Sequence, residues 1–154
     1  MRNVLIFVFI LLFSISAKAD DLTTKMRNLF SESAKKETSA KELYTLTSKY
    51  TATSKAIYIG YKGVAELMMC NHVFSVTKKL GYFNSGKKWL ELAIKQDPKN
   101  VELKFLRHCI QKNVPGFLGY NNNLATDNAE ITKYINNPAS DSKLVAFMRL
   151  NKQS

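Results

Sequence analysis

Apolar residues recur at intervals of three and four along almost the whole chain, and no long segment alternates between apolar and polar residues. The first spacing places apolar side chains on one face of an α-helix, whereas alternation would indicate a half-buried strand. The pattern therefore predicts an all-α fold of about six to seven helices, arranged as antiparallel hairpins in one bundle.

Helix ends are predicted from the prolines, glycines and capping residues between the apolar stretches. Asp97-Pro98 ends one helix, because the residue before a proline is disfavoured in the helical conformation, and Asn100 is a good N-cap for the next. Residues 31–39 are polar and rich in Lys, Ser and Glu, which predicts a mobile connection. The predicted helices cover residues 21–34, 39–50, 53–70, 73–96, 100–112, 126–136 and 140–151.

Two glycines lie inside the predicted helix 53–70. Gly60 and Gly63 each cost about 1 kcal/mol relative to Ala in a helix, and with Ala56 they form a strip of small residues. Close approach of a neighbouring helix would offset this cost. A loop at residues 60–63 is the alternative, and the apolar periodicity on either side favours the helix.

The predicted helix 73–96 carries the widest apolar surface. Its two apolar stripes together span about half of the helix circumference. We therefore expect this helix to be the structural centre and to contact two or more neighbours. The first stripe consists of Leu80, Phe83, Leu90 and Ile94, and the second of Tyr82, Gly86, Trp89 and Ala93.

The first nineteen residues have the three parts of a secretory signal peptide. A short basic start precedes an apolar run over residues 4–15, and Ala17 and Ala19 occupy positions −3 and −1 before Asp20. The apolar run is shorter than the about 20 residues that cross a membrane. We therefore predict cleavage between Ala19 and Asp20, and export of a single helical domain, residues 20–154, to the periplasm or the medium. An uncleaved leader that acts as an anchor is the alternative.

The positive charge of the chain limits the classes of partner that it can attract. Loss of Arg2 and Lys18 with the leader lowers the formal net charge by two from +11, to +9. A basic exported chain attracts anionic lipid, envelope polysaccharide or acidic proteins, although a solvated lysine-rich surface is the simpler interpretation. Nucleic acid is not expected, because the chain has no basic run interleaved with aromatic residues. No transmembrane span is expected after the leader.

The segment from Gly86 to Asn100 has the residue spacing of a known repeat helix. Gly86, Leu90, Ala93, Pro98 and Asn100 follow the pattern small–x3–large–x2–Ala–x4–Pro–x–Asn, which resembles the second helix of a tetratricopeptide repeat. The resemblance covers about half of one repeat. It implies closely packed helix pairs that bind a peptide or protein segment between helices.

The rest of the chain departs from that repeat. Ile59-Gly60 matches the Leu-Gly pair of a first repeat helix, but Gly63 stands where a tyrosine belongs, and the interval from Gly60 to Gly86 is too long for a tight hairpin. Because a single repeat cannot bury its own face, the resemblance implies a tetratricopeptide-like bundle rather than a regular superhelix. Residues 81–120 also resemble short exported bacterial proteins of unassigned activity, which implies a shared fold only.

Metal, redox and catalytic chemistry have few candidate residues. The two histidines each lie beside a cysteine, as Cys70-Asn71-His72 and His108-Cys109, but residues one or two apart on a helix point in different directions and do not converge on zinc. Export permits a disulfide between the two cysteines, and free thiols in apolar helices are the alternative. No catalytic motif is present. The chain is therefore predicted to be non-enzymatic, without cofactor or metal, and an enzyme of unrecognised type is the alternative.

Two surfaces are candidate binding sites. Nine basic residues between positions 78 and 112 face only three acidic ones, which predicts a positive face on the two central helices. The loop 117–123 is the other, because exposed aromatic loops on rigid scaffolds often bind partners. The alternatives are a solvated basic face and a loop whose aromatic side chains plug the core. The partner-binding candidates are Lys87, Lys88, Lys95, Arg107, Phe117 and Tyr120.

These features predict an exported, non-enzymatic helical interaction or scaffold module that binds a protein or peptide partner. The alternative is a protein that binds anionic envelope lipid or polysaccharide through the lysine-rich face. Strong salt sensitivity would distinguish that alternative, because salt screens exposed charges over about 8–10 Å.

Overall fold

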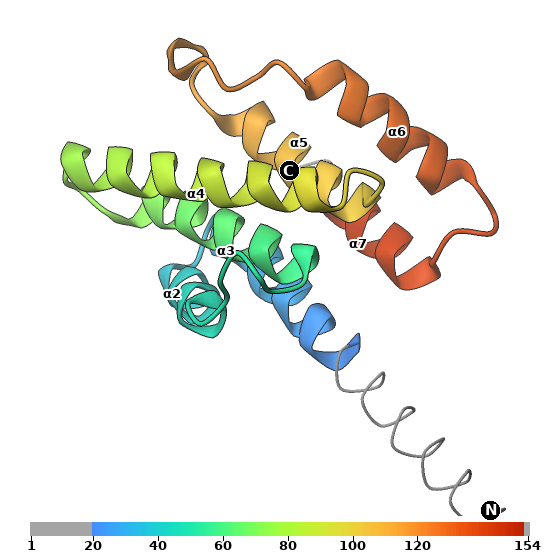
Figure 1. Cartoon of the computed structure of the whole chain (residues 1–154), viewed down its shortest axis with the longest axis horizontal. Coiled ribbons are helices and arrows are strands. Elements are labelled where there is room, and N and C mark those ends of the chain that lie inside the picture. Colours follow the sequence, from blue (N-terminus) through green and yellow to red (C-terminus); the bar gives the residue numbers. More distant parts are fainter. Residues whose placement is uncertain (1–19, 153–154) are drawn as a thin grey trace, which may run out of the picture.

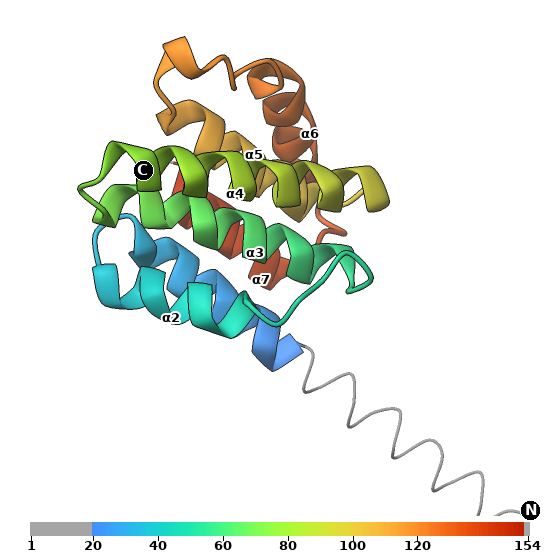
Figure 2. The ribbon, with the colours of Figure 1, turned by 60° about the vertical axis from the view of Figure 1, so that its left-hand side comes forward.

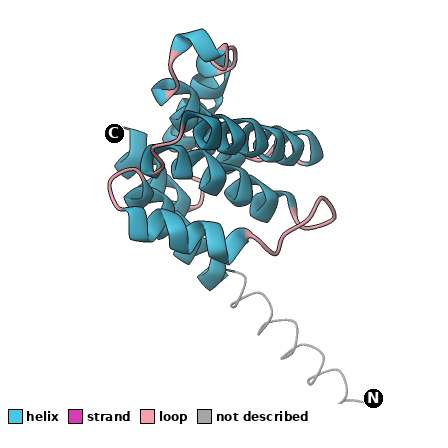
Figure 3. Ribbon diagram, turned by 90° about the vertical axis from the view of Figure 1, so that its left-hand side faces the viewer, coloured by secondary structure: helices cyan, strands magenta, loops and turns pink. Residues whose placement is uncertain are grey.

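The computed structural model describes residues 20–152, and every regular element in that range is a helix (Figure 1, Figure 3). The predicted all-α fold is therefore confirmed. None of the described helices is long and apolar enough to cross a membrane. The predicted leader, residues 1–19, lies outside the described residues. The helices are residues 20–33, α2 (Glu37–Thr47), α3 (Ala56–Met69), η1 (Cys70–His72), α4 (Val76–Gln96), α5 (Val101–Asn113), η2 (Gly116–Leu118), α6 (Leu124–Asn136) and α7 (Ser142–Lys152), where η marks a short 3-10 helix.

The connection predicted over residues 31–39 is mostly helical. The first described helix continues to residue 33 and α2 begins at Glu37, so a turn of three residues joins them. Ser39 Oγ donates a hydrogen bond to Glu32 Oε2 at 2.8 Å, and Ser33 and Ser39 are both buried. Polar composition suggested a loop, but Ser39 bonds to Glu32 across the turn and Ser33 bonds to the Leu29 carbonyl oxygen of its own helix.

The most buried helix is α3, so the prediction that the helix 73–96 is the structural centre is wrong. Its expected contact with two or more neighbours is confirmed, because α4 contacts both α3 and α5. Nine residues of α3 are buried, against five in the longer α4. α3 contacts α2, α4 and α5, and Figure 2 shows it between α2 and α4. The apolar stripes of α4 are buried only from Phe83 onward, and Leu80 is 50% exposed.

Three glycines allow α3 to approach its neighbours closely. A Cβ atom built on Gly63 would lie 2.7 Å from the Gly86 carbonyl oxygen of α4, and one built on Gly60 would collide with the Leu103 side chain of α5. The helical interpretation of residues 60–63 is therefore confirmed, with the close approach that it required. The interval from Gly60 to Gly86 was expected to be too long for a tight hairpin, and that expectation is wrong. Residues 70–75 reverse the chain, and α3 packs along α4.

The helix ends around Pro98 follow the prediction. Asp97 is the C-cap of α4, and Asn100 is the N-cap of α5. The Asn100 Oδ1 atom accepts hydrogen bonds from the backbone N–H groups of Glu102, at 3.1 Å, and Leu103, at 3.3 Å. These bonds satisfy donors that the first turn of a helix leaves unpaired.

The first and last described helices pack against each other across the core. Phe147 of α7 contacts the rings of Phe30 at 6.0 Å and Phe105 at 5.4 Å, both edge to face. Asn151 also donates a hydrogen bond to Ser31 Oγ at 3.0 Å. The buried core cluster runs from Met26 to Met148. The core therefore links the first described helix to the last.

A buried polar group links the first described helix to α3 and α5. The Arg27 guanidinium donates two hydrogen bonds to the Glu102 carboxylate, at 2.8 and 2.7 Å, and the Tyr61 hydroxyl donates a third at 2.6 Å. Burial raises the pKa of Tyr61 well above its usual value. Because these charged groups satisfy one another, they hold three helices in register without an unpaired buried charge.

Candidate binding surface on α4 and the α5–α6 loop

The structure separates the six predicted partner-binding residues into an exposed and a buried set. Lys88 and Lys95 of α4 and Phe117 of the α5–α6 loop are exposed, and Lys87 is half-buried. Arg107 and Tyr120 are buried. The predicted surface is therefore smaller than expected and lies along α4 beside the loop, which Figure 1 shows in orange above the start of α4.

Arg107 of α5 belongs to an internal ion-pair cluster, so its assignment to the positive face is wrong. Its guanidinium donates two hydrogen bonds to Asp127 of α6, at 2.8 and 2.9 Å, and one to Glu91 of α4 at 2.9 Å. The side chains of Arg107 and Asp127 are 9% and 2% exposed. We therefore assign Arg107 a structural role: it joins three helices and offers no charge to a partner.

Tyr120 anchors the loop in the core, as the alternative interpretation predicted. Its ring packs edge to face on Phe83 at 6.1 Å, and its hydroxyl donates a hydrogen bond to Glu91 at 2.6 Å. Burial is the main reason that the pKa of Tyr120 lies well above its usual value. The Lys87 ammonium lies 4.8 Å from the centre of the same ring, a cation–π distance. Tyr120 is therefore removed from the list of partner-binding residues.

Phe117 extends from this anchored loop into solvent and is 87% exposed. The 3-10 helix η2 contains Phe117, and Gly119 closes it with a left-handed backbone, φ 62°. Glycine adopts that conformation without a side-chain clash. Next to Phe117 in the same turn, Leu118 packs against the core. The Phe117 ring therefore lies in solvent, on a loop in which Leu118 and Tyr120 pack against the core.

Sequence reasoning missed a second exposed apolar group, at the turn between α3 and α4. Phe74 is 102% exposed, Val76 79% and Leu80 50%, although apolar spacing predicts Leu80 in a core stripe. The available signal was Ser75, whose side chain accepts a hydrogen bond from the Lys78 backbone N–H and so begins α4 at Val76. Residues 74–81 are all exposed, so the first turns of α4 lie outside the packed part of the bundle.

The two pairs of His and Cys residues lie in different elements, one in η1 and the other in α5. Cys70 and Cys109 are free thiols rather than a disulfide. Burial raises the pKa of both thiols, that of Cys109 to about 12. His72 Nε2 is 2.6 Å from the Ser33 carbonyl oxygen, and burial lowers the pKa of His108. Among residues 20–152, no three His, Cys, Asp or Glu side chains lie together as a metal-binding group.

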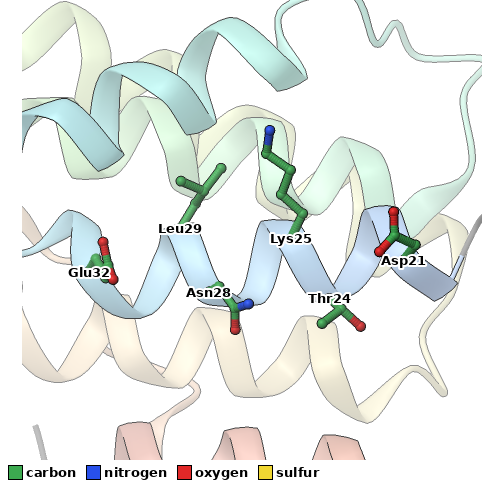
Figure 4. A pocket seen from close by; sticks show the side chains of 6 residues that line it. All are labelled: Asp21, Thr24, Lys25, Asn28, Leu29 and Glu32. Atoms are coloured by element: carbon green, nitrogen blue, oxygen red, sulfur yellow. The ribbon is translucent and has the colours of Figure 1, made fainter.

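A shallow trough lies along the first described helix. Its volume is about 250 Å³. Figure 4 shows that the lining side chains leave this one helix in different directions, with Leu29 and Lys25 on one side and Asn28 and Thr24 on the other. Because no polar groups converge in it, the trough lacks the features of a small-molecule site.

Glu66 of α3 is a buried carboxyl group that lacks full hydrogen bonding. It is 7% exposed, and its Oε2 atom has no hydrogen-bond partner. Burial raises its pKa above 4.5, and Ser85 and Lys62 only partly oppose the shift. A folded-state pKa above the unfolded value means that folding favours the protonated form. The contribution of Glu66 to stability is therefore most favourable below pH 4.5 and falls as the pH rises through the raised pKa.

Glu66→Gln is accordingly expected to stabilise the protein at pH 7 and to leave stability nearly unchanged at pH 4. The reason is that a neutral amide avoids the cost of burying a charge. Thermal unfolding followed by circular dichroism from pH 4 to pH 8 measures the difference. Glu37→Gln is the control, because Lys41 lowers the pKa of that exposed carboxyl. Lower stability of the Glu66→Gln variant than of wild type at pH 7 would contradict the prediction.

Comparison of the chain with protein-family models, with curated proteins and with solved structures finds no match.

Proposed function

We propose that this chain is an exported, non-enzymatic helical interaction module that binds a protein or peptide partner through the α5–α6 loop. The observation that carries the proposal is the contrast within that loop. Phe117 is 87% exposed, while Tyr120, three residues later, is 5% exposed and hydrogen-bonded to Glu91. The loop thus displays one aromatic side chain on a fixed base.

A fixed aromatic side chain is well suited to binding. Aromatic residues carry much of the binding energy at protein interfaces, and a loop that is already ordered loses little entropy when a partner binds. Lys87 of α4 lies beside the loop, since it contacts the Tyr120 ring, and the exposed Lys88 follows it in α4. These lysines suit a partner segment that carries acidic residues next to an apolar side chain.

Three further points support the proposal. The resemblance of residues 86–100 to a tetratricopeptide half-repeat favours a binding role, because such repeats bind peptides. The buried charges of Arg27 and Arg107 are neutralised by carboxylates and hold helices together, which favours a structural role over a catalytic one. The pattern of residues 1–19 favours export to the periplasm or the medium after cleavage before Asp20, and the mass of the exported chain tests that cleavage.

The test is a photo-crosslinking amino acid at position 117 of the chain produced in its own cells. We expect a discrete crosslinked partner from position 117 and none from Ala129, an exposed control on α6. Phe117→Ser should reduce retention of that partner by at least about tenfold. It should leave the unfolding temperature unchanged, because the ring makes little contact with the core.

The salt dependence of partner retention and the crosslinking from the control position distinguish the possible outcomes. Retention at high salt supports a contact centred on Phe117, whereas retention that salt abolishes would support the lysine-rich face of α4 as a site for anionic envelope material. Equal crosslinking from positions 117 and 129, or full retention by Phe117→Ser, would contradict the proposal.

A further inference from the structure

The turn between α3 and α4 ends in a group of exposed apolar and basic side chains. We call this group, which is Phe74, Val76, Lys78, Lys79 and Leu80, the α3–α4 tip. Its three apolar members are 102%, 79% and 50% exposed in chain order, although a soluble domain buries most side chains of this kind. Figure 1 shows the turn, in green, at one end of the molecule, where the start of α4 extends beyond α3.

The backbone of the tip is held in place. His72 Nε2 lies 2.6 Å from the Ser33 carbonyl oxygen, and the Cys70 thiol donates a hydrogen bond to the Lys79 carbonyl oxygen at 3.4 Å. Ser75 caps the start of α4. The tip therefore displays its apolar side chains from an ordered turn, and the next apolar core residue of α4, Phe83, is already buried.

The charge around the tip is positive. The chain has no acidic residue between Glu66 and Glu91, a stretch that contains four lysines. The contact of His72 with Ser33 places the turn 34–36, with Lys35 and Lys36, beside the tip. The two acidic residues that flank this turn each pair with a lysine, so that Lys36 is neutralised and Lys35 adds the positive charge. Glu32 pairs with Lys36 at 3.2 Å and Glu37 with Lys41 at 2.7 Å.

We propose that the α3–α4 tip docks on an anionic lipid bilayer. Phe74, Val76 and Leu80 enter the boundary between headgroups and acyl chains, and Lys78 and Lys79 contact lipid phosphates. Exposed apolar side chains suit a bilayer, because they bury into the boundary between headgroups and acyl chains. The pairing of apolar and basic side chains matches the two attractions of an anionic membrane surface. This surface is distinct from Phe117, and the inference does not rest on the proposed protein partner.

The test is co-sedimentation of the processed chain, residues 20–154, with vesicles. Vesicles of phosphatidylcholine containing about 30% phosphatidylglycerol, an anionic lipid, are compared with vesicles of phosphatidylcholine alone. We expect binding to the anionic vesicles at low salt. Lys78→Gln with Lys79→Gln should weaken this binding about 25-fold, at about fivefold for each lysine. Phe74→Ser with Leu80→Ser should weaken it by at least about tenfold.

Two matched control variants distinguish binding through the tip from binding through overall positive charge or through any exposed apolar side chain. Lys133→Gln with Arg149→Gln removes two exposed positive charges from α6 and α7 and should weaken binding by no more than about threefold. Phe117→Ser removes a similarly exposed aromatic ring from outside the tip and should leave vesicle binding unchanged. The unfolding temperature of every variant is measured alongside, so that loss of fold is recognised.

Three results would overturn the proposal. The first is absence of wild-type binding to the anionic vesicles at low salt. The second is an equal loss of binding in the tip variants and the charge control. The third is a tip variant that binds vesicles as wild type does but loses the partner crosslinked from position 117, because that result assigns the tip to the protein partner.

Discussion

Gly63→Ala is expected to lower the free energy of unfolding by about 3 kcal/mol, near the upper end of the cost of overpacking a core. A Cβ atom at this position would lie 2.6 Å from the Leu90 nitrogen and 2.7 Å from the Gly86 carbonyl oxygen. Both are backbone atoms, so no side-chain rotation relieves the clash and α3 and α4 must separate. The separation loosens the contact between the two most closely packed helices. Urea unfolding followed by circular dichroism measures the loss.

Gly81→Ala is the matched control for this prediction. Gly81 also lies inside a helix, but a Cβ atom there has no neighbouring atom within 4 Å. The substitution should therefore stabilise the protein by about 1 kcal/mol, which is the difference in helix propensity between Gly and Ala. If both substitutions change stability in the same direction by similar amounts, the close contact between α3 and α4 is not the reason for glycine at position 63.

Arg107→Met is expected to destabilise the protein by about 3–5 kcal/mol, the typical cost of removing one partner from a buried ion pair. The substitution leaves the Asp127 carboxylate, which is 2% exposed, without the two hydrogen bonds that the guanidinium donates. It also removes the link to Glu91, and with it part of the support for Tyr120 and the α5–α6 loop. Denaturant unfolding measures the change.

A double-mutant cycle identifies the cause. Arg107→Met combined with Asp127→Leu removes both buried charges, so the pair should destabilise the protein much less than the sum of the two single substitutions. Lys88→Met removes an exposed charge from α4 and should change stability by about 0.5 kcal/mol or less. Additive losses in the cycle would contradict the ion-pair interpretation.

The helices and several of their ends could be predicted from sequence because they depend on neighbouring residues. Apolar spacing located α3, α4, α5, α6 and α7 to within a few residues. Asp97-Pro98 and Asn100 placed a helix boundary where the structure has one. Even the cost of Gly60 and Gly63 in a helix correctly indicated a close neighbour.

The sequence predicted residues for the candidate site but did not show which of them are buried. Arg107 and Lys88 look alike in sequence, since each is a basic residue on an amphipathic helix. Arg107 is buried because α6 brings Asp127 to it from 20 residues away along the chain. Leu80 follows the apolar spacing of α4 but is exposed. The spacing shows which face of a helix is apolar, and it does not show where along the helix the neighbouring elements stop.

The sequence by itself determined the all-α class, the order of the helices and the capping of α5, because hydrogen bonds and apolar spacing within a helix involve residues close in the chain. Only the tertiary structure decided which charged and aromatic side chains are left for a partner. Tyr120 and Phe117 lie three residues apart in one loop, yet one contacts Phe83 and Glu91 while the other extends into solvent. The physical reason is that burial depends on residues from other helices, and their positions follow from packing that local sequence does not encode.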